Sequence, residues 1–382
     1  MQSNKLRMAI RATAAAAVLG VAGQAGAVSF NAGDYEMSVY GYGRLNASYD
    51  IDSDQSLSTR SGSYAGLANN DDAPDGHFGA DAFQSRIGVN TVSPQGVKIN
   101  VEGDFRGSGG GVLRLRHAYG EYNGVLMGQT WSNFTSFVGN TSTLDFDSLP
   151  GLAGFQGRSA QARYTSGPLS VSLEEPNSSF LSDAANDAQK DGLPALTARL
   201  EDSADGLSYS AAVLAHQVGY DTGDDDESTF GFATFAAAKM ALSDMITIQG
   251  TVSYSDGANS YLYRSGDNFG AASAYVDPAN GDVESVSGYG GSVGAGFNLG
   301  GGRSINIGYG IVEVDWDDAE DDLGAAAVAD QSESNEAIMA NYQWTPVQNV
   351  MMGVEYQFLK RENVNGDDGD ANRVLFAAQY NF

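Results

Sequence analysis

Residues 36–51 read EMSVYGYGRLNASYDI, and this stretch decides the fold. Successive side chains of a strand point to opposite faces. One face is apolar or small and carries Met37, Val39, Gly41, Gly43, Leu45, Ala47, Tyr49 and Ile51. The other is mostly polar and carries Glu36, Ser38, Tyr40, Tyr42, Arg44, Asn46, Ser48 and Asp50. Strands of soluble domains usually have about five or six residues, so a run this long predicts a tilted strand that crosses a bilayer and projects beyond it.

A second stretch repeats this pattern with charges. Residues 113–134 read LRLRHAYGEYNGVLMGQTWSNF, so Leu113 and Leu115 share one face while Arg114 and Arg116 share the other. Asn-Gly at 123–124 is a strong hairpin signal. The period of two recurs almost throughout the chain and predicts sixteen strands, at 36–51, 82–92, 97–107, 112–122, 125–131, 159–166, 169–177, 194–202, 207–220, 229–243, 245–255, 286–300, 304–316, 335–345, 349–362 and 372–382.

The connections between these strands predict their arrangement. Short turns, rich in turn-forming residues, lie at 93–96, 123–124, 166–168, 203–206, 243–244, 300–303 and 345–348. They alternate with connections that are mostly longer, at about 52–81, 132–158, 178–193, 256–285, 317–334 and 363–371. An even strand count with short periplasmic turns and longer extracellular loops is typical of an all-β, transmembrane antiparallel barrel.

A soluble β-sandwich is the competing fold, since it also has many short strands. Two features favour the barrel. Aromatic residues lie near predicted strand ends, including Trp131, Trp316 and Trp344, where they suit the girdles at membrane interfaces. The predicted inner face is polar, whereas a sandwich would bury an apolar face between its sheets.

The first 27 residues have the layout of a secretory signal peptide. Lys5, Arg7 and Arg11 precede an apolar run, and Ala25-Gly26-Ala27 is a small-residue cleavage site. We therefore predict a cleaved signal at 1–27 and a barrel domain at 28–382. The mature chain has no cysteine and no apolar run of about 18 residues, so we expect no transmembrane helix.

Acidic residues dominate the mature chain. Without the three basic residues of the signal, 17 Lys and Arg stand against 48 Asp and Glu, a formal charge of −31. Nucleic-acid binding requires a basic footprint, so this class of partner is excluded.

The last ten residues, RVLFAAQYNF, place Val374, Phe376, Ala378, Tyr380 and Phe382 on one face. This alternation with a terminal phenylalanine resembles the C-terminal recognition signal of outer-membrane barrel proteins. The resemblance implies that Phe382 engages the barrel insertion machinery.

Four motifs in order narrow the resemblance: YGYGRLNASYD (40–50), the stretch 113–134, TLDFDSLPG (143–151) and QARYTSGP (161–168). Together with the C-terminal signature, they resemble the DcaP-like family of trimeric outer-membrane porins of Gram-negative bacteria. The family implies a sixteen-stranded homotrimeric barrel, in contact with outer-membrane lipid and lipopolysaccharide, that takes up small, often anionic solutes. Family members can carry a periplasmic helical extension before the barrel, whereas only residues 28–35 separate the signal from the first strand here.

The connection after the fifth strand, residues 132–158, holds Phe134, Phe137, Asp145, Asp147 and Phe155. It resembles the loop that folds inward in porins and narrows the channel. A solvated surface loop is the alternative.

Strand parity places several arginines on the inner face, with Lys98 and Gln161 beside them: Arg44, Arg86, Arg106, Arg114, Arg116 and Arg163. Our hypothesis is an arginine ladder opposite Asp145 and Asp147, whose transverse field orients and passes small anions such as carboxylates. The alternative is that these arginines pair with Glu36, Glu102 and Asp104, which leaves a nonselective pore. A cation-preferring porin also stays open, since inward charge tunes selectivity without favouring one sign.

Blocks of carboxylates fall in the long connections, at 221–227, 315–322 and 367–370. Such blocks are usually solvated, although clustered oxygens could bind calcium in the loops. Residues 50–61 begin like an EF-hand, but Gln55 stands where glycine is required and Ser61 where glutamate is required. We therefore predict no cofactor and no metal site from that motif.

No catalytic motif accompanies the three histidines, His77, His117 and His216. His117 falls on the apolar face of its strand, where it would serve an outer-membrane lipase or, more simply, pack against a neighbouring protomer. A receptor or adhesin would need a plug domain or much longer loops. The sequence therefore predicts a passive outer-membrane diffusion channel for small hydrophilic solutes and not an enzyme.

Overall fold

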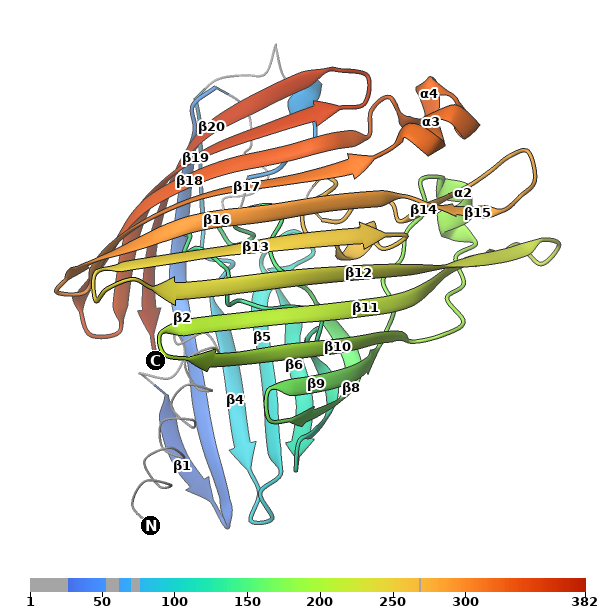
Figure 1. Cartoon of the computed structure of the whole chain (residues 1–382). Coiled ribbons are helices and arrows are strands. Elements are labelled where there is room, and N and C mark those ends of the chain that lie inside the picture. The colour runs from blue at the N-terminus through green and yellow to red at the C-terminus, as the bar shows by residue number, and fades with distance from the viewer. Residues whose placement is uncertain (1–26, 53–61, 70–75, 268) are drawn as a thin grey trace.

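Strands make up most of the computed structural model, which describes residues 27–52, 62–69, 76–267 and 269–382 (Figure 1). The strands are β1 (Val28–Ala32), β2 (Tyr35–Asp50), β3 (His77–Asp81), β4 (Arg86–Val92), β5 (Lys98–Gly107), β6 (Val112–Tyr122), β7 (Val125–Trp131), β8 (Arg158–Ser166), β9 (Leu169–Glu174), β10 (Ala195–Ala204), β11 (Leu207–Asp221), β12 (Asp226–Ala241), β13 (Ile246–Asp256), β14 (Ala274–Val276), β15 (Val283–Ser285), β16 (Ser287–Gly300), β17 (Arg303–Asp315), β18 (Ser332–Val347), β19 (Val350–Asn363) and β20 (Asp368–Asn381). The predicted signal peptide lies outside the described residues, apart from Ala27.

The strands form a closed barrel. Each wall strand is antiparallel to the next, and β20 returns to β2 in a register that runs from Tyr42 opposite Asn381 to Asp50 opposite Arg373. β3 and β4 pair with successive parts of β2 and share one position in the wall. With β14 and β15 forming a separate hairpin and β1 an addition to β2, the wall has sixteen positions. The predicted sixteen-stranded barrel is confirmed.

Strand ends agree with the sequence prediction within four residues, apart from the strand expected at 82–92. That strand is broken between β3 and β4, where Arg44 N–H donates to Ser85 Oγ at 2.9 Å instead of to a backbone carbonyl. The sequence did not predict β1, the β14–β15 hairpin or the helices η1 (Leu67–Asn69), α2 (Asp183–Asp187), η2 (Asn259–Tyr261), α3 (Asp317–Leu323) and α4 (Ala325–Val328). Among the described residues, no helix is long and apolar enough to span a membrane.

The seven predicted short turns all join neighbouring strands at one rim, which is also the rim of the C-terminus (Figure 1). In the turn between β6 and β7, Asn123 and Gly124 have φ angles of 48° and 81°. A two-residue hairpin turn with both central φ angles positive matches the twist of its strands, and Asn-Gly tolerates it best. The opposite rim carries the long connections, and we refer to the two as the short-turn rim and the long-loop rim.

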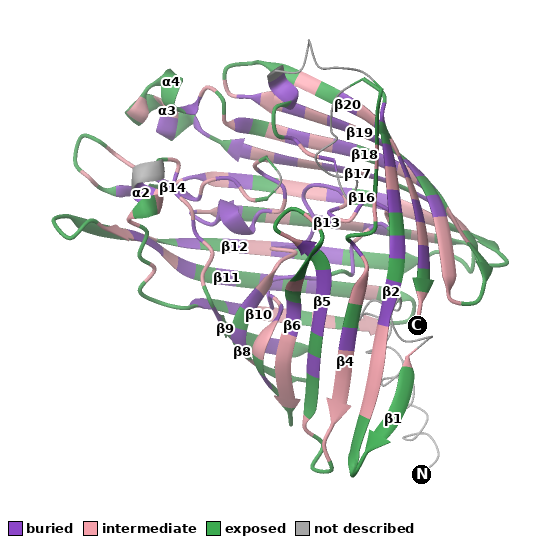
Figure 2. Cartoon of the chain, turned by 180° about the vertical axis from the view of Figure 1, so that it is seen from behind, coloured by how far each residue is buried: buried purple, intermediate pink, exposed green. Residues whose placement is uncertain are grey.

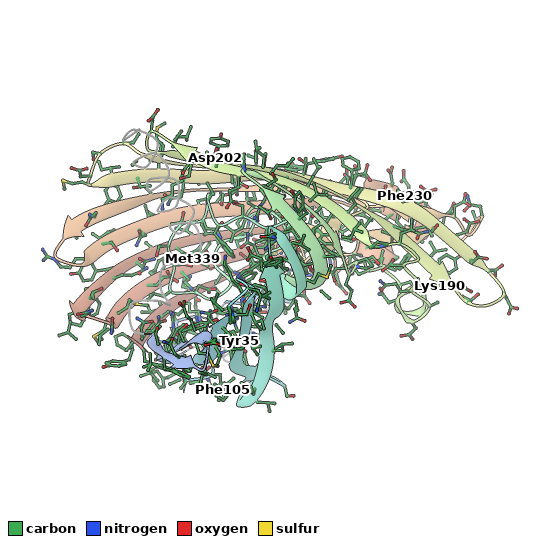
Figure 3. All side chains as sticks on the ribbon, turned by 90° about the horizontal axis from the view of Figure 1, so that it is seen from below. Tyr35, Phe105, Lys190, Asp202, Phe230 and Met339 are labelled. Atoms are coloured by element: carbon green, nitrogen blue, oxygen red, sulfur yellow. The ribbon has the colours of Figure 1, made fainter. Side chains whose placement is uncertain are left out.

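Side chains alternate between the two sides of the wall. In the upper part of β2, Arg44, Asn46, Ser48 and Asp50 are buried while Leu45 and Tyr49 are exposed, and Figure 2 shows such bands on the long strands. Likewise Met339 is buried on the inner face of β18, whereas Phe230 of β12 is exposed (Figure 3). The apolar outer face and polar inner face are those that strand parity predicts.

The tryptophans correct one sequence-based interpretation. Only Trp344 lies on the outside, where its ring stacks on Tyr342 with centroids 5.4 Å apart. Trp316 is buried beneath α3 and α4, and its Nε1–H donates to Ser332 O at 3.0 Å. The Trp131 ring packs against Phe137, in the connection between β7 and β8. Two of the three tryptophans therefore serve packing at strand ends and not a membrane girdle.

Candidate functional site

The β7–β8 hairpin does not stop at the wall. Ser132 N–H donates to Gly157 O at 3.0 Å, and Phe155 N–H donates to Phe134 O at 2.8 Å. The ladder thus continues beyond both strand ends into residues 132–157, the constriction loop.

The constriction loop crosses the inside of the barrel to strands far from its origin. Thr251 Oγ1 of β13 donates to Gly151 O at 2.6 Å, and Asn341 Nδ2 of β18 donates to Ser142 O at 2.8 Å. Both donors lie on the inner face of the wall, so the loop segment between these contacts lies within the barrel.

The tip of the loop is held by opposite charges on two strands. Arg44 Nη2 of β2 donates to Leu144 O at 2.7 Å. The Glu355 carboxylate of β19 accepts from Leu144 N–H at 2.7 Å and from Asp145 N–H at 2.9 Å. Hydrogen bonds to charged groups are the stronger kind, so these three contacts fix the tip.

Glycines on the wall make room for the loop. A Cβ at Gly310 of β17 would lie 2.4 Å from Pro150 O, and one at Gly353 of β19 would lie 2.8 Å from Leu144 Cδ2. Any side chain at these inward positions would displace the loop. This close approach explains why glycine interrupts the inward pattern of β17 and β19.

The near part of the loop is anchored by apolar packing. Phe134, Val138 and Ala153 are buried against inward residues of β11 and β12. The Phe134 ring lies 5.1 Å from the Phe235 ring, centroid to centroid. Burial of such a cluster contributes a few kcal/mol per large side chain.

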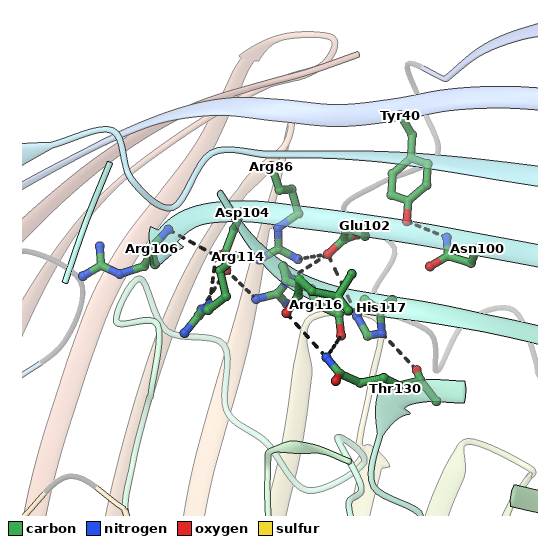
Figure 4. A network of polar contacts seen from close by, with 12 residues as sticks. Tyr40, Arg86, Asn100, Glu102, Asp104, Arg106, Arg114, Arg116, His117 and Thr130 are labelled. Carbon is green, nitrogen blue, oxygen red and sulfur yellow. Dashed lines mark hydrogen bonds and ion pairs between the residues drawn. The ribbon is translucent and has the colours of Figure 1, made fainter. Parts of the chain in front are cut away.

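Arginines and carboxylates from β4, β5 and β6 meet on the opposite part of the inner wall (Figure 4). Arg116 donates from Nε to Glu102 Oε1 at 2.7 Å and from Nη1 to Asp104 Oδ2 at 3.0 Å. Arg114 grips the same Asp104 with two donors, at 3.0 and 2.8 Å. Arg86 Nη1 lies 3.5 Å from Glu102 Oε1. The sequence predicted these arginines, and Glu102 and Asp104 as their possible partners.

A bulge in β6 corrects the position of His117. Glu102 lies opposite His117 and Gly103 opposite Leu115, so Arg116 is an extra residue and the parity of the strand reverses after it. His117 is buried, its Nδ1 lies 3.0 Å from Thr130 Oγ1 and its Nε2 lies 3.9 Å from Glu102 Oε1. His117 therefore joins the inner network and does not face a neighbouring protomer.

Sequence reasoning missed Arg158, the first residue of β8. Its guanidinium lies 4.5 Å from the centroid of the Trp131 ring, and the charges that act on it most are those of Arg116 and Arg114. One of its nitrogens, Nη1, is buried without a hydrogen-bond partner. Arg158 directly precedes the strand expected at 159–166, where parity gives no orientation, so only the fold could reveal it.

Aromatic rings complete this part of the wall. The Arg116 guanidinium lies 5.8 Å from the Trp131 ring centroid and 5.7 Å from that of Phe146, which belongs to the constriction loop. Phe137 packs edge-on against Trp131 at 5.0 Å. The loop and the arginine cluster, defined as Arg86, Arg114, Arg116 and Arg158, therefore approach each other here.

The predicted aspartates of the loop lie elsewhere. Asp145 is buried, and its carboxylate accepts from Gln357 Nε2 at 2.8 Å and from Gly62, Asp147 and Ser148 N–H at 2.8 to 3.0 Å. These acceptors are occupied by the loop, by β19 and by the connection after β2. The charges of Asp145 and Asp147 act on Arg264, in the connection between β13 and β16, and that of Asp145 also acts on Arg44. Of the six predicted arginines, Arg44 is the one that contacts the loop beside Asp145, through Leu144 O. The role of the two aspartates opposite an arginine ladder stays a prediction.

The other predicted residues have separate surroundings. Arg44 fixes the loop tip, Arg106 Nη1 lies 3.6 Å from Asp81 Oδ2, and Lys98 pairs with Glu121 at 3.7 Å on the short-turn side. Gln161 Nε2 donates to Trp131 O at 2.9 Å. Arg163 lies near Arg199 and Glu174 on the wall beyond the cluster.

Carboxylates gather at the long-loop rim. Helix α3 begins with Asp317, Asp318 and Glu320, and the β11–β12 hairpin carries another block. A hydrogen bond with Asp221 raises the pKa of the exposed Lys190 ammonium at this rim. Within the described ranges, no three carboxylates or imidazoles come close enough to hold a metal ion. Calcium binding by the loops stays an untested prediction.

A closed sixteen-stranded wall, a loop across its inside and a charged inner surface together define a channel of the outer-membrane porin type. A family profile named DcaP outer membrane protein matches residues 24–382. The chain belongs to the DcaP outer membrane protein family, and its location is the outer membrane. The predicted family and location are confirmed.

Solved structures agree with this assignment. The crystal structure of the outer membrane channel DcaP of Acinetobacter baumannii is similar with a TM-score of 0.79 and 29% identity, over 93% of this chain and 100% of that one. Salmonella typhi OmpF in complex with daunomycin matches with a TM-score of 0.58 at 11% identity, over 93% and 100% of the two chains. An anion-selective porin from Comamonas acidovorans matches at 0.55 and 12%, over 91% and 100%. These two share the fold alone. A search of curated protein sequences gave no significant match.

Proposed function

We propose that this porin is a passive channel for small hydrophilic solutes that favours small anions such as carboxylates, without a catalytic step. The observation that supports it most is the charge of the arginine cluster. Among the described residues, its four guanidinium groups share two carboxylates, Glu102 and Asp104. Two positive charges therefore remain in excess beside the loop, where reduced dielectric strengthens their effect on a passing ion.

This arrangement changes the roles that the hypothesis of an arginine ladder gave to its residues. Arg86, Arg114 and Arg116 are partly neutralised wall residues, and Arg158 supplies a charge without a carboxylate of its own. Arg44, Asp145 and Asp147 would act on selectivity indirectly, through the position of the loop. Arg106 and Arg163 would add a weaker positive field along the path.

A nonselective or cation-preferring porin is the alternative, and the acidic long-loop rim favours it. Carboxylates at a channel mouth raise the local concentration of cations by an amount that falls as salt rises. The constriction lies deeper and is narrower, so we expect its charge to outweigh that of the rim at physiological salt, where the Debye length is about 8 Å.

Uptake by proteoliposomes tests the proposal with solutes matched in size. Gluconate, sorbitol and N-methylglucammonium share a six-carbon chain and differ in charge. We expect gluconate to enter faster than sorbitol, and sorbitol faster than N-methylglucammonium. The reverse order would support a cation-preferring porin, and equal rates would support a nonselective one.

We also propose that the channel is a homotrimer whose copies meet at β6–β9. β7 has seven residues and β9 has six, so at about 3.3 Å per residue and 40° tilt they rise only roughly 15 to 18 Å, less than the apolar band of about 25 Å. β11 and β12, with 15 and 16 residues, span that band. The exposed Leu113, Leu115 and Met127 on this short-stranded part of the wall would then contact a neighbouring copy.

The remaining expectations concern export and assembly. We propose cleavage of the signal after Ala27, insertion guided by the C-terminal strand, and contact of the outer wall with lipid and lipopolysaccharide. Phe382 exchanges two backbone hydrogen bonds of 3.0 Å with Gly41, so the last residue closes the barrel seam.

A further inference from the structure

Arg264 lies in the connection between β13 and β16, and its side chain is fully buried inside the barrel. Its guanidinium joins two other loops. Nη1 donates to Ser148 O of the constriction loop at 2.5 Å, and Nη2 donates to Gly62 O of the connection after β2 at 2.6 Å. The guanidinium also lies 4.7 Å from the centroid of the Tyr64 ring.

The neighbours of Arg264 reinforce the same junction. Tyr263 OH donates to Asp147 O at 2.7 Å, and Gly151 N–H donates to Tyr263 O at 3.1 Å. Gly62 N–H in turn donates to Asp145 Oδ2 at 3.0 Å. Three loops distant in sequence thus contact one another in pairs around a single side chain.

The wall holds this junction from behind. Asn335 Nδ2 of β18 donates to Arg264 O at 2.9 Å and to Gly266 O at 2.8 Å. Leu149 and Leu152 pack with Tyr263 against Ala337 and Met339 of the same strand. The junction is therefore fastened to the part of the wall that does not carry the arginine cluster.

Burying a guanidinium is unfavourable unless its donors and charge are compensated. Arg264 has two carbonyl acceptors, an aromatic face and the nearby charges of Asp145 and Asp147. A short polar side chain could not reach both carbonyls at once. The geometry requires a long, forked donor at this position.

We infer that Arg264 is a positioning residue that, with the other anchors of the constriction loop, sets the width of the channel. By joining the constriction loop to the connection after β2 and to β18, it keeps the loop against the β17–β2 part of the wall. Permeation is then confined to the side of the arginine cluster. This inference requires only that the protein is a channel, and it holds for either sign of ion selectivity.

Single-channel recording of the full-length protein in planar bilayers tests the inference. We expect Arg264→Gln to raise conductance about twofold and to add fluctuations between sublevels, because the loop is released from one of its supports. Arg264→Lys retains the charge and one donor direction, so we expect partial rescue. Arg303→Gln is the matched control, since Arg303 is exposed at the start of β17, at the short-turn rim, and it should keep wild-type conductance.

A merely structural Arg264 would lower the thermal stability of the barrel and leave conductance and current noise unchanged in the folded channel. That result would overturn the inference. If Arg264→Gln does not fold, Tyr64→Leu removes the ring against the guanidinium from a loop and not from a wall strand. Wild-type conductance and noise in Tyr64→Leu would equally overturn it. The order of solute uptake in the wild type tests the proposed function separately.

Discussion

Asp50 of β2 and Arg373 of β20 lie directly opposite each other at the seam where the barrel closes, with Arg373 Nε 2.7 Å from Asp50 Oδ1 and both side chains fully buried. Breaking a buried ion pair by removing one partner usually costs about 3 to 5 kcal/mol, because the other charge stays buried. We expect Arg373→Met to lower the unfolding transition in detergent and Asp50→Asn with Arg373→Met to recover part of the loss. Wild-type stability in Arg373→Met would mean that the seam does not depend on this pair.

Glu355 gives a prediction for the loop tip. Its two oxygens accept from Leu144 and Asp145 N–H, and Glu355→Gln would turn one acceptor into a donor facing a donor. We expect extra current noise in single channels. Glu121→Gln is the control. It also removes a carboxylate, but Glu121 pairs with Lys98 on the short-turn side and not with the loop. Equal noise in both variants would argue against an anchoring role for Glu355.

Two substitutions that each remove one charge from the same network should shift selectivity in opposite directions. Glu102→Gln raises the excess positive charge of the cluster and Arg158→Gln lowers it. A unit charge about 8 Å from an ion in water contributes about 0.5 kcal/mol, with opposite signs for an anion and a cation. The two effects add to about 1 kcal/mol in the anion-to-cation permeability ratio, so we expect roughly fivefold changes in that ratio, upward for Glu102→Gln and downward for Arg158→Gln. Shifts in the same direction, or none, would remove the cluster from the selectivity mechanism.

A charged side chain on the outer face of β6 tests the proposed trimer contact. Leu115→Arg should reduce the trimer fraction on seminative gels, because an unpaired guanidinium would be buried between copies. Val252→Arg is the control, since Val252 is at least as exposed, at 64% against 50%, and lies on the long-stranded side. Loss of trimer only in Val252→Arg would place the contact on the other face.

Local patterns predicted the wall well because a β-barrel has a simple rule. Each strand alternates between lipid and lumen, so Leu113 and Arg114 could be assigned to faces from the sequence, and turn residues such as Asn123-Gly124 marked the strand ends. The rule failed where the backbone departs from it. The bulge at Arg116 moved His117 inward, and the Trp131 ring packs against Phe137 of the constriction loop.

The site was predicted less completely, because it depends on contacts between distant segments. Arg114, Arg116, Glu102 and Asp104 lie on neighbouring strands, so parity could bring them together. Asp145 faces Gln357 and Gly62, which are 212 and 83 residues away in sequence. No local periodicity encodes such contacts. The contacts of Arg264 with the other two loops were not predicted for the same reason.

The reversal potential of the wild-type channel under a potassium chloride gradient tests the central claim most directly. Potassium and chloride have similar mobilities, so the sign of the potential reports the charge that governs the constriction. We predict the sign of an anion-preferring channel, with a preference that weakens in Arg158→Gln. A cation-preferring sign in the wild type would contradict the account and assign selectivity to the acidic long-loop rim.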